Sequence, residues 1–285
     1  AGMVRAAYSS GKPAFGVGPG NVPVLVDASA DLPAAIERIV SGKKFDYGTV
    51  CSSEQTLVAE RSLRDRILTE LTRQRAVLLN DEQRQALERT LFAHGTTVRA
   101  DCVGQSPQKI AQLAGFTVPA DATILCAEIH GVGKDHPLSA EKLSPVLALL
   151  FTPCFDTALD ACEAILQFGG LGHTSVIHAL DDAQVRRFGL RMPSFRVLVN
   201  TGAPQGSVGF TTALQPAMTL GCGAIAGNIT GDNIGPLHLV NIKRIAWAVR
   251  SAEEAMPPAP AAASLDKTAL IAAVEKHLAQ RGITL

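Results

Sequence analysis

The chain is organised around the stretch Lys43-Lys44-Phe45-Asp46-Tyr47-Gly48-Thr49-Val50-Cys51-Ser52-Ser53-Glu54-Gln55. The apolar run Thr56-Leu57-Val58-Ala59 follows at once and has the composition of a buried strand. A polar, glycine-containing approach to a strand places the thiol of Cys51 on a turn at the edge of a sheet, where a substrate can reach it. An ordinary cysteine has a pKa of about 8.5, so we expect backbone N–H groups of this turn to favour the thiolate and to hold an oxyanion. The alternative is that Cys51 is a small buried core residue.

The composition limits the class of protein. The chain has 285 residues, 47% of them hydrophobic, which is ample for the core of one large or two ordinary domains. Lysine plus arginine and aspartate plus glutamate are balanced at 26 each, so we expect neither nucleic acid nor a membrane surface as a partner. The six cysteines form no Cys-x-x-Cys pair, which argues against a metal site and for a reducing cytoplasm. No apolar run reaches the ~18 residues of a membrane helix.

Strand-like and helix-like segments alternate along the chain. The periodicity predicts strands within 24–26, 56–59, 123–126, 146–150, 175–178 and 196–200, and helices over 1–8, 31–39, 62–73, 81–94, 156–167 and 183–190. Asp31 is the expected N-cap of the second helix. This β-α-β rhythm predicts an α/β fold with a doubly wound sheet.

Several motifs together carry a resemblance to a known family. The segment Phe45–Gln55 resembles the active-site segment of CoA-acylating aldehyde dehydrogenases, which include the ethanolamine- and propanediol-utilisation enzymes and the aldehyde half of bifunctional aldehyde-alcohol dehydrogenases. The Glu-Lys-Leu-Ser-Pro-Val run at 141–146 and the block at 227–244 also resemble this family, and the resemblance covers about residues 1–250. It implies that residues 1–22 end a dinucleotide-binding domain, that 23–250 are the catalytic domain, and that most of a Rossmann-like cofactor domain is missing from the chain.

The resemblance implies a reaction. Cys51 would attack an aldehyde to give a thiohemiacetal, a hydride would pass to NAD, and CoA would take the acyl group from the resulting thioester. Hydrolytic aldehyde dehydrogenases carry a water-activating glutamate near the run Gly18-Pro19-Gly20-Asn21, and this chain has none there. The thioester would therefore survive until a second thiol arrives.

The resemblance also implies roles for other residues. Glu141 would contact the nicotinamide ribose, and we place Gly18 and Gly20 beside it as cofactor-binding residues. His173, in the loop-like run Gly170-Leu171-Gly172-His173-Thr174, would take the proton of the incoming thiol, although it could instead only satisfy backbone groups. The expected substrate pocket contains Thr219, Gly221 and Cys222.

The end of the chain has a different composition. Residues 251–264 are rich in proline and alanine and predict a linker, and residues 265–285 predict an amphipathic helix. Such a helix could dock on its own subunit. It also resembles the peptides that carry enzymes of this family into bacterial microcompartments, where it would contact the shell.

Other functions stay open at this point. A hydrolytic aldehyde dehydrogenase is the nearest alternative, and a cysteine hydrolase or acyltransferase without redox chemistry is the second. The third is an inactive, truncated scaffold or assembly subunit. The family implies a cytoplasmic homo-oligomer, and nothing in the sequence identifies the aldehyde.

Overall fold

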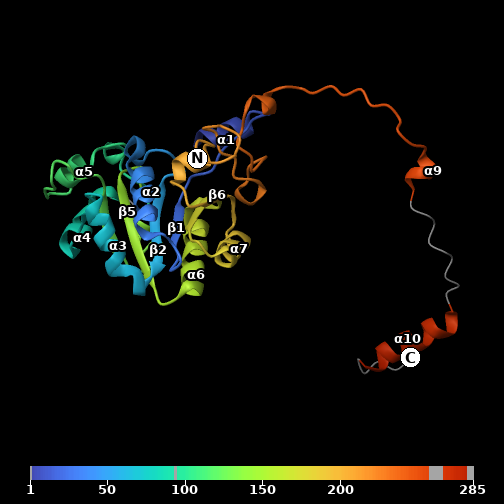
Figure 1. Cartoon of the computed structure of the whole chain (residues 1–285). Coiled ribbons are helices and arrows are strands. Elements are labelled where there is room, and N and C mark those ends of the chain that lie inside the picture. Colours follow the sequence, from blue (N-terminus) through green and yellow to red (C-terminus); the bar gives the residue numbers. More distant parts are fainter. Residues whose placement is uncertain (1, 93–94, 257–265, 281–285) are drawn as a thin grey trace. The chain divides into compact units, whose positions relative to one another are not determined.

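A parallel sheet forms the centre of the first part of the chain (Figure 1). The computed structural model describes residues 2–92, 95–256 and 266–280, and residue contacts divide the chain into Ala1–Val240 and Asn241–Leu285. In the first unit the described strands are β1 (Val22–Val26), β2 (Glu54–Glu60), β3 (Val77–Leu78), β4 (Leu125–Ile129), β5 (Val146–Thr152), β6 (Gly172–His178) and β7 (Ser194–Val199). They pair in the order β3-β4-β5-β2-β1-β6-β7, and every pair is parallel.

The direction in which the chain moves across the sheet reverses once, at β3. From β1 the chain moves outward through β2 to β3, returns through β4 to β5, and then crosses β2 and β1 to reach β6 and β7. Because crossovers between parallel strands are right-handed, this reversal places helices on both faces of the sheet. One face packs against α2 (Leu32–Lys44), α3 (Arg64–Arg73) and α8 (Ala203–Ser207). The other packs against α4 (Asp81–Leu91), α5 (Pro107–Leu113), α6 (Phe155–Ile165) and α7 (Asp182–Arg191).

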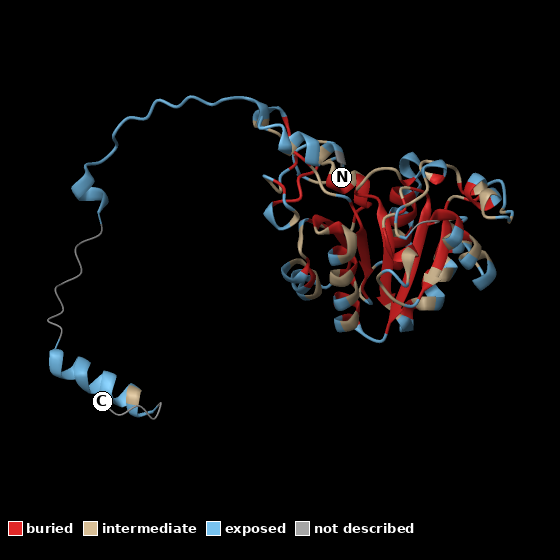
Figure 2. Cartoon of the chain, turned by 180° about the vertical axis from the view of Figure 1, so that it is seen from behind, coloured by how far each residue is buried: buried red, intermediate tan, exposed pale blue. Residues whose placement is uncertain are grey.

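The central strands are buried on both faces (Figure 2). All seven residues of β5 are buried, and its side chains alternate between the two hydrophobic cores. Strands covered on both faces have near-continuous apolar sequences, which is why the run at 146–150 predicts a strand. The predicted doubly wound α/β fold is confirmed.

The ends of several elements follow their capping residues. Asp31 caps α2 as predicted, because its side chain accepts a hydrogen bond from Ala34 N at 3.3 Å. The helix α4 is capped by Asn80 and ends at Leu91. The rest of that predicted helix includes residues 93–94, which lie outside the described residues. The first helix, α1, spans Gly2–Ser9.

Several sequence-based expectations were wrong or incomplete. The elements β3, α5 and α8 were not predicted: two strand residues show no periodicity, α5 has as its signal only Ser106 followed by Pro107, and α8 has only five residues. The run containing His173 was expected to be a loop, yet β6 begins at Gly172. The strand forms there because Gly172 and Thr174 are in register with Ser194 and Arg196 of β7.

The second unit contains two described helices, α9 (Ala252–Ala255) and α10 (Lys267–Ala279). In α10 the apolar residues Leu270, Ile271 and Val274 are exposed. Both ends of the helix predicted over 265–285 lie outside the described residues, and so does most of the predicted linker. Within the described ranges, no helix has the length and apolarity needed to span a bilayer. The predicted domain boundaries at residues 22, 250 and 264 stay predictions.

Candidate active site

The predicted site residues come from segments that precede or begin neighbouring strands. Gly18 and Gly20 lie in the loop before β1, Cys51 lies in the turn before β2, Glu141 precedes β5, and His173 is the second residue of β6. These strands are adjacent and parallel, in the order β5-β2-β1-β6, so the segments share the amino edge of the sheet. Open α/β sheets usually bind ligands at the carboxyl edge, and this site therefore lies at the opposite end.

The turn before Cys51 has an unusual backbone. Asp46, Tyr47 and Gly48 are consecutive residues with φ of 47°, 49° and 71°. Non-glycine residues in the left-handed region cost about 1 kcal/mol or more each, and they persist where the surroundings hold them. Thr49 helps to stabilise this backbone conformation, because its hydroxyl donates to the backbone carbonyl of Asp46 at 2.9 Å. A Cβ at Gly48 would lie 2.4 Å from the carbonyl oxygen of Ser144, so only glycine fits there.

The residues after Cys51 fix the other side of the turn. Ser52 Oγ accepts a hydrogen bond from Ser207 Oγ at 2.6 Å, and Glu54 Oε1 accepts one from Ala203 N, also at 2.6 Å. Both partners belong to α8. Gln55 Oε1 accepts from the backbone N of Lys142 at 3.0 Å, next to Glu141. One short segment therefore connects the Cys51 turn to α8 and to the predicted cofactor residue.

Gly20 lies between Cys51 and Glu141. Its backbone N donates to Glu141 Oε1 at 3.2 Å. A Cβ added to Gly20 would lie 1.6 Å from the carbonyl oxygen of Cys51, so the two backbones are in direct contact. Such a close approach requires glycine. The structure thus brings together three of the residues that the sequence assigned to one site.

The setting of Cys51 does not favour the thiolate in this structure. Burial and the nearby carboxylate of Glu141 raise the pKa of Cys51 to about 11, against smaller opposing effects of Arg196 and of the backbone. The backbone of the turn lowers the pKa of Cys51, in the direction expected, but burial and Glu141 outweigh this effect. Burial also raises the pKa of Glu141, to about 7, although the hydrogen bond from Gly20 opposes this.

Glu141→Gln is expected to make Cys51 more reactive. Above pH 8 the carboxylate of Glu141 is ionised, and a like charge disfavours the thiolate, so its removal should lower the pKa of Cys51. We expect alkylation by iodoacetamide at pH 8–9 to accelerate about tenfold, which corresponds to a pKa lower by about one unit. Glu163→Gln, which removes a carboxylate bonded to Arg191 on the surface, is the matched control. An unchanged or slower reaction of the Glu141 variant would contradict this electrostatic assignment.

Arg196 connects the region around His173 to the 219–233 segment. Its guanidinium donates to the carbonyl oxygen of Gly231 at 2.9 Å and to Asn233 Oδ1 at 3.4 Å. It also donates to the carbonyl oxygen of Gly221. Its Nε donates to Thr174 Oγ1 at 3.3 Å. Arg196 is 3% exposed. The sequence interpretation missed it, although an arginine at the start of the apolar strand predicted over 196–200 was a usable signal.

His173 is fully buried beside this arginine. Its Nδ1 lies 2.9 Å from Thr174 Oγ1, and within the described residues its Nε2 has no hydrogen-bond partner. Burial, together with the charge of Arg196, lowers the pKa of His173 to about 3, so the imidazole is neutral at physiological pH. The predicted proton-accepting role of His173 is not tested by these contacts.

The three residues predicted to line the substrate pocket differ in how far they are buried. The thiol of Cys222 is buried, accepts a hydrogen bond from Gly18 N at 3.3 Å and donates to the carbonyl of Leu220 at 3.6 Å. Gly221 is also buried and is held by Arg196. Thr219 is exposed, and its carbonyl oxygen accepts from Ile234 N at 2.9 Å. The assignment of all three residues to a pocket stays a prediction.

Three ionisable side chains near the Cys51 turn in sequence or in space are buried, and the sequence analysis did not predict this. Lys43, Glu54 and Lys142 are at most 1% exposed. Burial lowers the pKa of Lys43 to about 7 and raises that of Glu54 to about 7. Lys142 Nζ donates to the carbonyls of Leu138 and Ala140 at 2.7 and 2.8 Å. Lys43 lies in the last turn of α2, Glu54 is the first residue of β2, and Lys142 precedes β5. Charged side chains at such positions are usually solvated, so the sequence held no signal for this burial.

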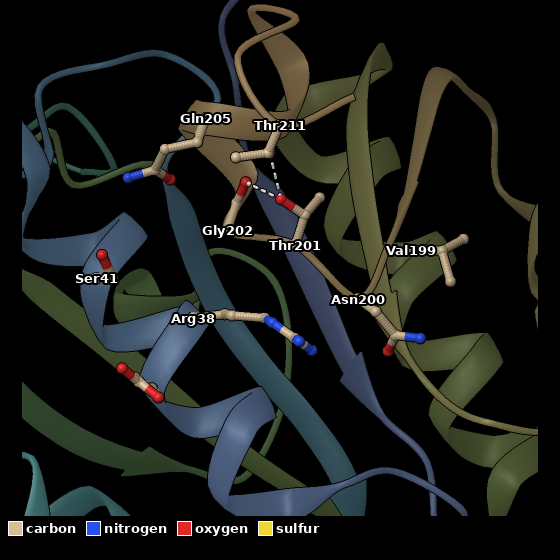
Figure 3. A pocket seen from close by; sticks show the side chains of 9 residues that line it. Arg38, Ser41, Val199, Asn200, Thr201, Gly202, Gln205 and Thr211 are labelled. Atoms are coloured by element: carbon tan, nitrogen blue, oxygen red, sulfur yellow. Dashed lines mark hydrogen bonds between the residues drawn. The ribbon is translucent and has the colours of Figure 1, made fainter. Parts of the chain in front are cut away.

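Figure 3 shows a separate polar pocket between α2 and the segment that follows β7. Thr201 and Thr211 point toward one another there, with 2.6 Å between their hydroxyl oxygens. Its lining contains none of the predicted site residues. Among the residues that the structure describes, no cluster of three or more His, Cys, Asp or Glu side chains could hold a metal ion.

The sequence and the fold of the chain have counterparts among known proteins. No protein-family model matches the chain. The chain is homologous to acylating aldehyde dehydrogenases, and the predicted resemblance is confirmed.

Three relatives show the extent of the similarity. Bifunctional aldehyde-alcohol dehydrogenase AdhE of Escherichia coli K12 is 41% identical over 250 residues, which are 86% of this chain and 28% of AdhE. The crystal structure of an acetylating aldehyde dehydrogenase from Geobacillus thermoglucosidasius superposes with a TM-score of 0.85 at 44% identity, covering 90% of this chain and 56% of that one. A Rhodopseudomonas palustris propionaldehyde dehydrogenase, solved with bound CoA and an acylated cysteine, gives 0.71 at 25% identity over 81% of this chain and 51% of its own. The chain thus spans about half or less of these relatives.

Proposed function

We propose that this protein oxidises an aldehyde to an acyl-CoA, with Cys51 as the nucleophile and NAD as the hydride acceptor. The observation that carries the proposal is the contact of Gly20 with both Cys51 and Glu141, in a chain homologous to acylating aldehyde dehydrogenases. The presence of CoA and an acylated cysteine in the R. palustris enzyme supports the same chemistry.

In the first half-reaction the thiolate of Cys51 forms a C–S bond with the aldehyde carbon, and the carbonyl oxygen becomes an oxyanion. Backbone N–H at Cys51 is one donor that this chain offers to the oxyanion. Burial and Glu141 raise the pKa of Cys51 to about 11, so a change in its surroundings would increase the fraction of thiolate. We propose that cofactor binding at Glu141 supplies it by engaging the carboxylate that disfavours the thiolate.

The residues present fit a nicotinamide nucleotide. Oε1 of Glu141 accepts from Gly20, which leaves the second carboxylate oxygen to accept hydrogen bonds from ribose hydroxyls. A bound nicotinamide would supply a hydride acceptor. Transfer of the hydride from the carbon attached to the Cys51 sulfur would leave a thioester on that sulfur.

In the second half-reaction CoA takes the acyl group. Its sulfur forms a bond with the thioester carbon, the bond to Cys51 breaks, and overall one proton passes from the CoA thiol to Cys51. Hydrolysis would need a base for water, and residues 10–21, the described loop before β1, contain no carboxylate or histidine. Asn21, at the end of that loop, donates to the carbonyls of Ser139 and Ile165 at 2.9 and 3.1 Å.

The finer assignments belong to the same proposal. We propose NAD over NADP, a homo-oligomeric enzyme in the cytoplasm, and Thr219, Gly221 and Cys222 as part of the pocket wall. We also propose that residues 265–285 contact a microcompartment shell, which the exposed apolar residues of α10 support.

Product analysis tests the proposed function. We expect incubation of the protein with propionaldehyde, NAD and CoA to give one NADH for each propionyl-CoA. Omission of CoA should stop turnover after one equivalent. Free propionate as the product would instead indicate a hydrolytic enzyme, and ester cleavage without NAD would indicate a cysteine hydrolase.

A further inference from the structure

Arg196, Thr174 and His173 form a chain of three buried side chains. Arg196 Nε lies 3.3 Å from Thr174 Oγ1, and Thr174 Oγ1 lies 2.9 Å from His173 Nδ1. Thr174 and His173 are fully buried, and Arg196 is 3% exposed. Thr174 and Arg196 are in register on β6 and β7, so the sheet itself fixes the first link of the chain.

The direction of the hydrogen bonds follows from the chemistry of the three groups. A guanidinium only donates, so Thr174 Oγ1 accepts from Arg196. A hydroxyl has one proton to donate, and within the described residues His173 Nδ1 is the acceptor that the structure gives to it. If Nδ1 carried a proton and donated instead, both the Thr174 hydroxyl proton and the Nε2 lone pair would be buried without partners. With the proton on Nε2, the Thr174 hydroxyl and His173 Nδ1 are paired with each other, and of the two side chains only Nε2–H lacks a partner within the described residues.

We infer that Arg196 and Thr174 are positioning residues that hold neutral His173 as the Nε2–H tautomer, so that His173 acts in acyl transfer as a hydrogen-bond donor to an acyl oxygen and not as a base. This inference rests on the proposed function for the identity of the bound group. The depressed pKa of His173 supports a neutral imidazole, which is also too weak a base to accept a proton from a thiol.

A buried donor without a partner is costly, and a ligand oxygen would satisfy it. Leaving an N–H group buried and unpaired costs about 1–3 kcal/mol. During transfer of the acyl group to CoA the thioester oxygen becomes an oxyanion, which needs fixed donors. The segment before His173 packs on the loop that contacts Cys51, because a Cβ at Gly170 would lie 2.7 Å from the backbone N of Asn21 and a Cβ at Gly20 would lie 1.6 Å from the carbonyl oxygen of Cys51.

Long-range ¹H–¹⁵N spectra of protein labelled at histidine test the tautomer without any activity measurement. We expect His173, assigned by its loss in His173→Gln, to show a protonated Nε2 and an unprotonated Nδ1 at pH 7. Thr174→Val removes the hydroxyl at nearly constant volume, and we expect it to mix the two tautomers. Thr56→Val, which removes another fully buried threonine hydroxyl, should leave the spectrum unchanged. A wild-type signal from Nδ1–H or from the imidazolium would overturn the inference.

Single-turnover acyl transfer tests the role. The amide of glutamine can place an N–H group near the position of Nε2–H but cannot accept a thiol proton. We therefore expect His173→Gln to transfer the acyl group at least about tenfold faster than His173→Ala. Equal, severe losses in both would overturn the donor role in favour of a base. If no acyl group ever forms on Cys51, the proposed function fails, while the spectra still decide the tautomer.

Discussion

Cys51→Ala is expected to abolish acyl-CoA formation. The thiol, on the turn before β2, supplies the bond that carries the acyl group between the two half-reactions. Removal of a catalytic nucleophile typically costs roughly four orders of magnitude or more in kcat. We expect NADH formation from propionaldehyde to fall to the background rate, measured with CoA present and absent.

The two cysteines of this region provide an internal control. Cys222→Ser removes the second thiol but keeps a group that can accept from Gly18 N. Because the proposed chemistry uses only the sulfur of Cys51, we expect the Cys222 variant to retain most of the activity. The reverse ranking, with an active Cys51→Ala protein and an inactive Cys222→Ser protein, would mean that the nucleophile has been misassigned.

Gly20→Ala is expected to have the second-largest effect. Its Cβ would lie 1.6 Å from the carbonyl oxygen of Cys51, and no rotamer change relieves a clash between two backbones. The Cys51 turn must therefore shift, and the hydrogen bond from Gly20 N to Glu141 must shift with it. A displacement of about 1 Å at a reacting group can cost roughly a hundredfold in rate. Overpacking adds a loss of about 1–3 kcal/mol in the free energy of unfolding. Steady-state kinetics and urea unfolding measure the two effects.

Gly169→Ala is the matched control for this substitution. A Cβ there meets the Asn21 side chain at 3.6 Å, which is an ordinary contact. We expect its kcat and unfolding midpoint to stay near those of the unmodified protein. If Gly20→Ala behaved in the same way, the close packing of Gly20 on Cys51 would be wrong.

The fold is largely predictable from the sequence because its core obeys simple periodicity. Buried strands such as β5 are continuous apolar runs, and α2 begins where Asp31 can cap it. Errors occurred where periodicity is silent. The strand β3 has two residues, and the glycine before His173 suggested a loop although pairing with β7 extends β6 to Gly172.

The candidate site was predictable only in part. Motifs placed Cys51, Glu141 and Gly20 in one site, and the structure brings them together. The pKa of Cys51 was not predictable, because burial and a neighbouring carboxylate depend on the packing of distant segments. The same limit hid Arg196, whose partners at Gly221 and Gly231 are far along the chain, and the buried Lys43 and Glu54.

In the proposed reaction, one sulfur carries the acyl group from the aldehyde to CoA. Peptide mass spectrometry after incubation with propionaldehyde and NAD tests this claim most directly. We expect a propionyl adduct on Cys51 that disappears when CoA is added, with propionyl-CoA released in equal amount. An adduct on another cysteine, or turnover with no CoA-sensitive adduct on Cys51, would contradict it.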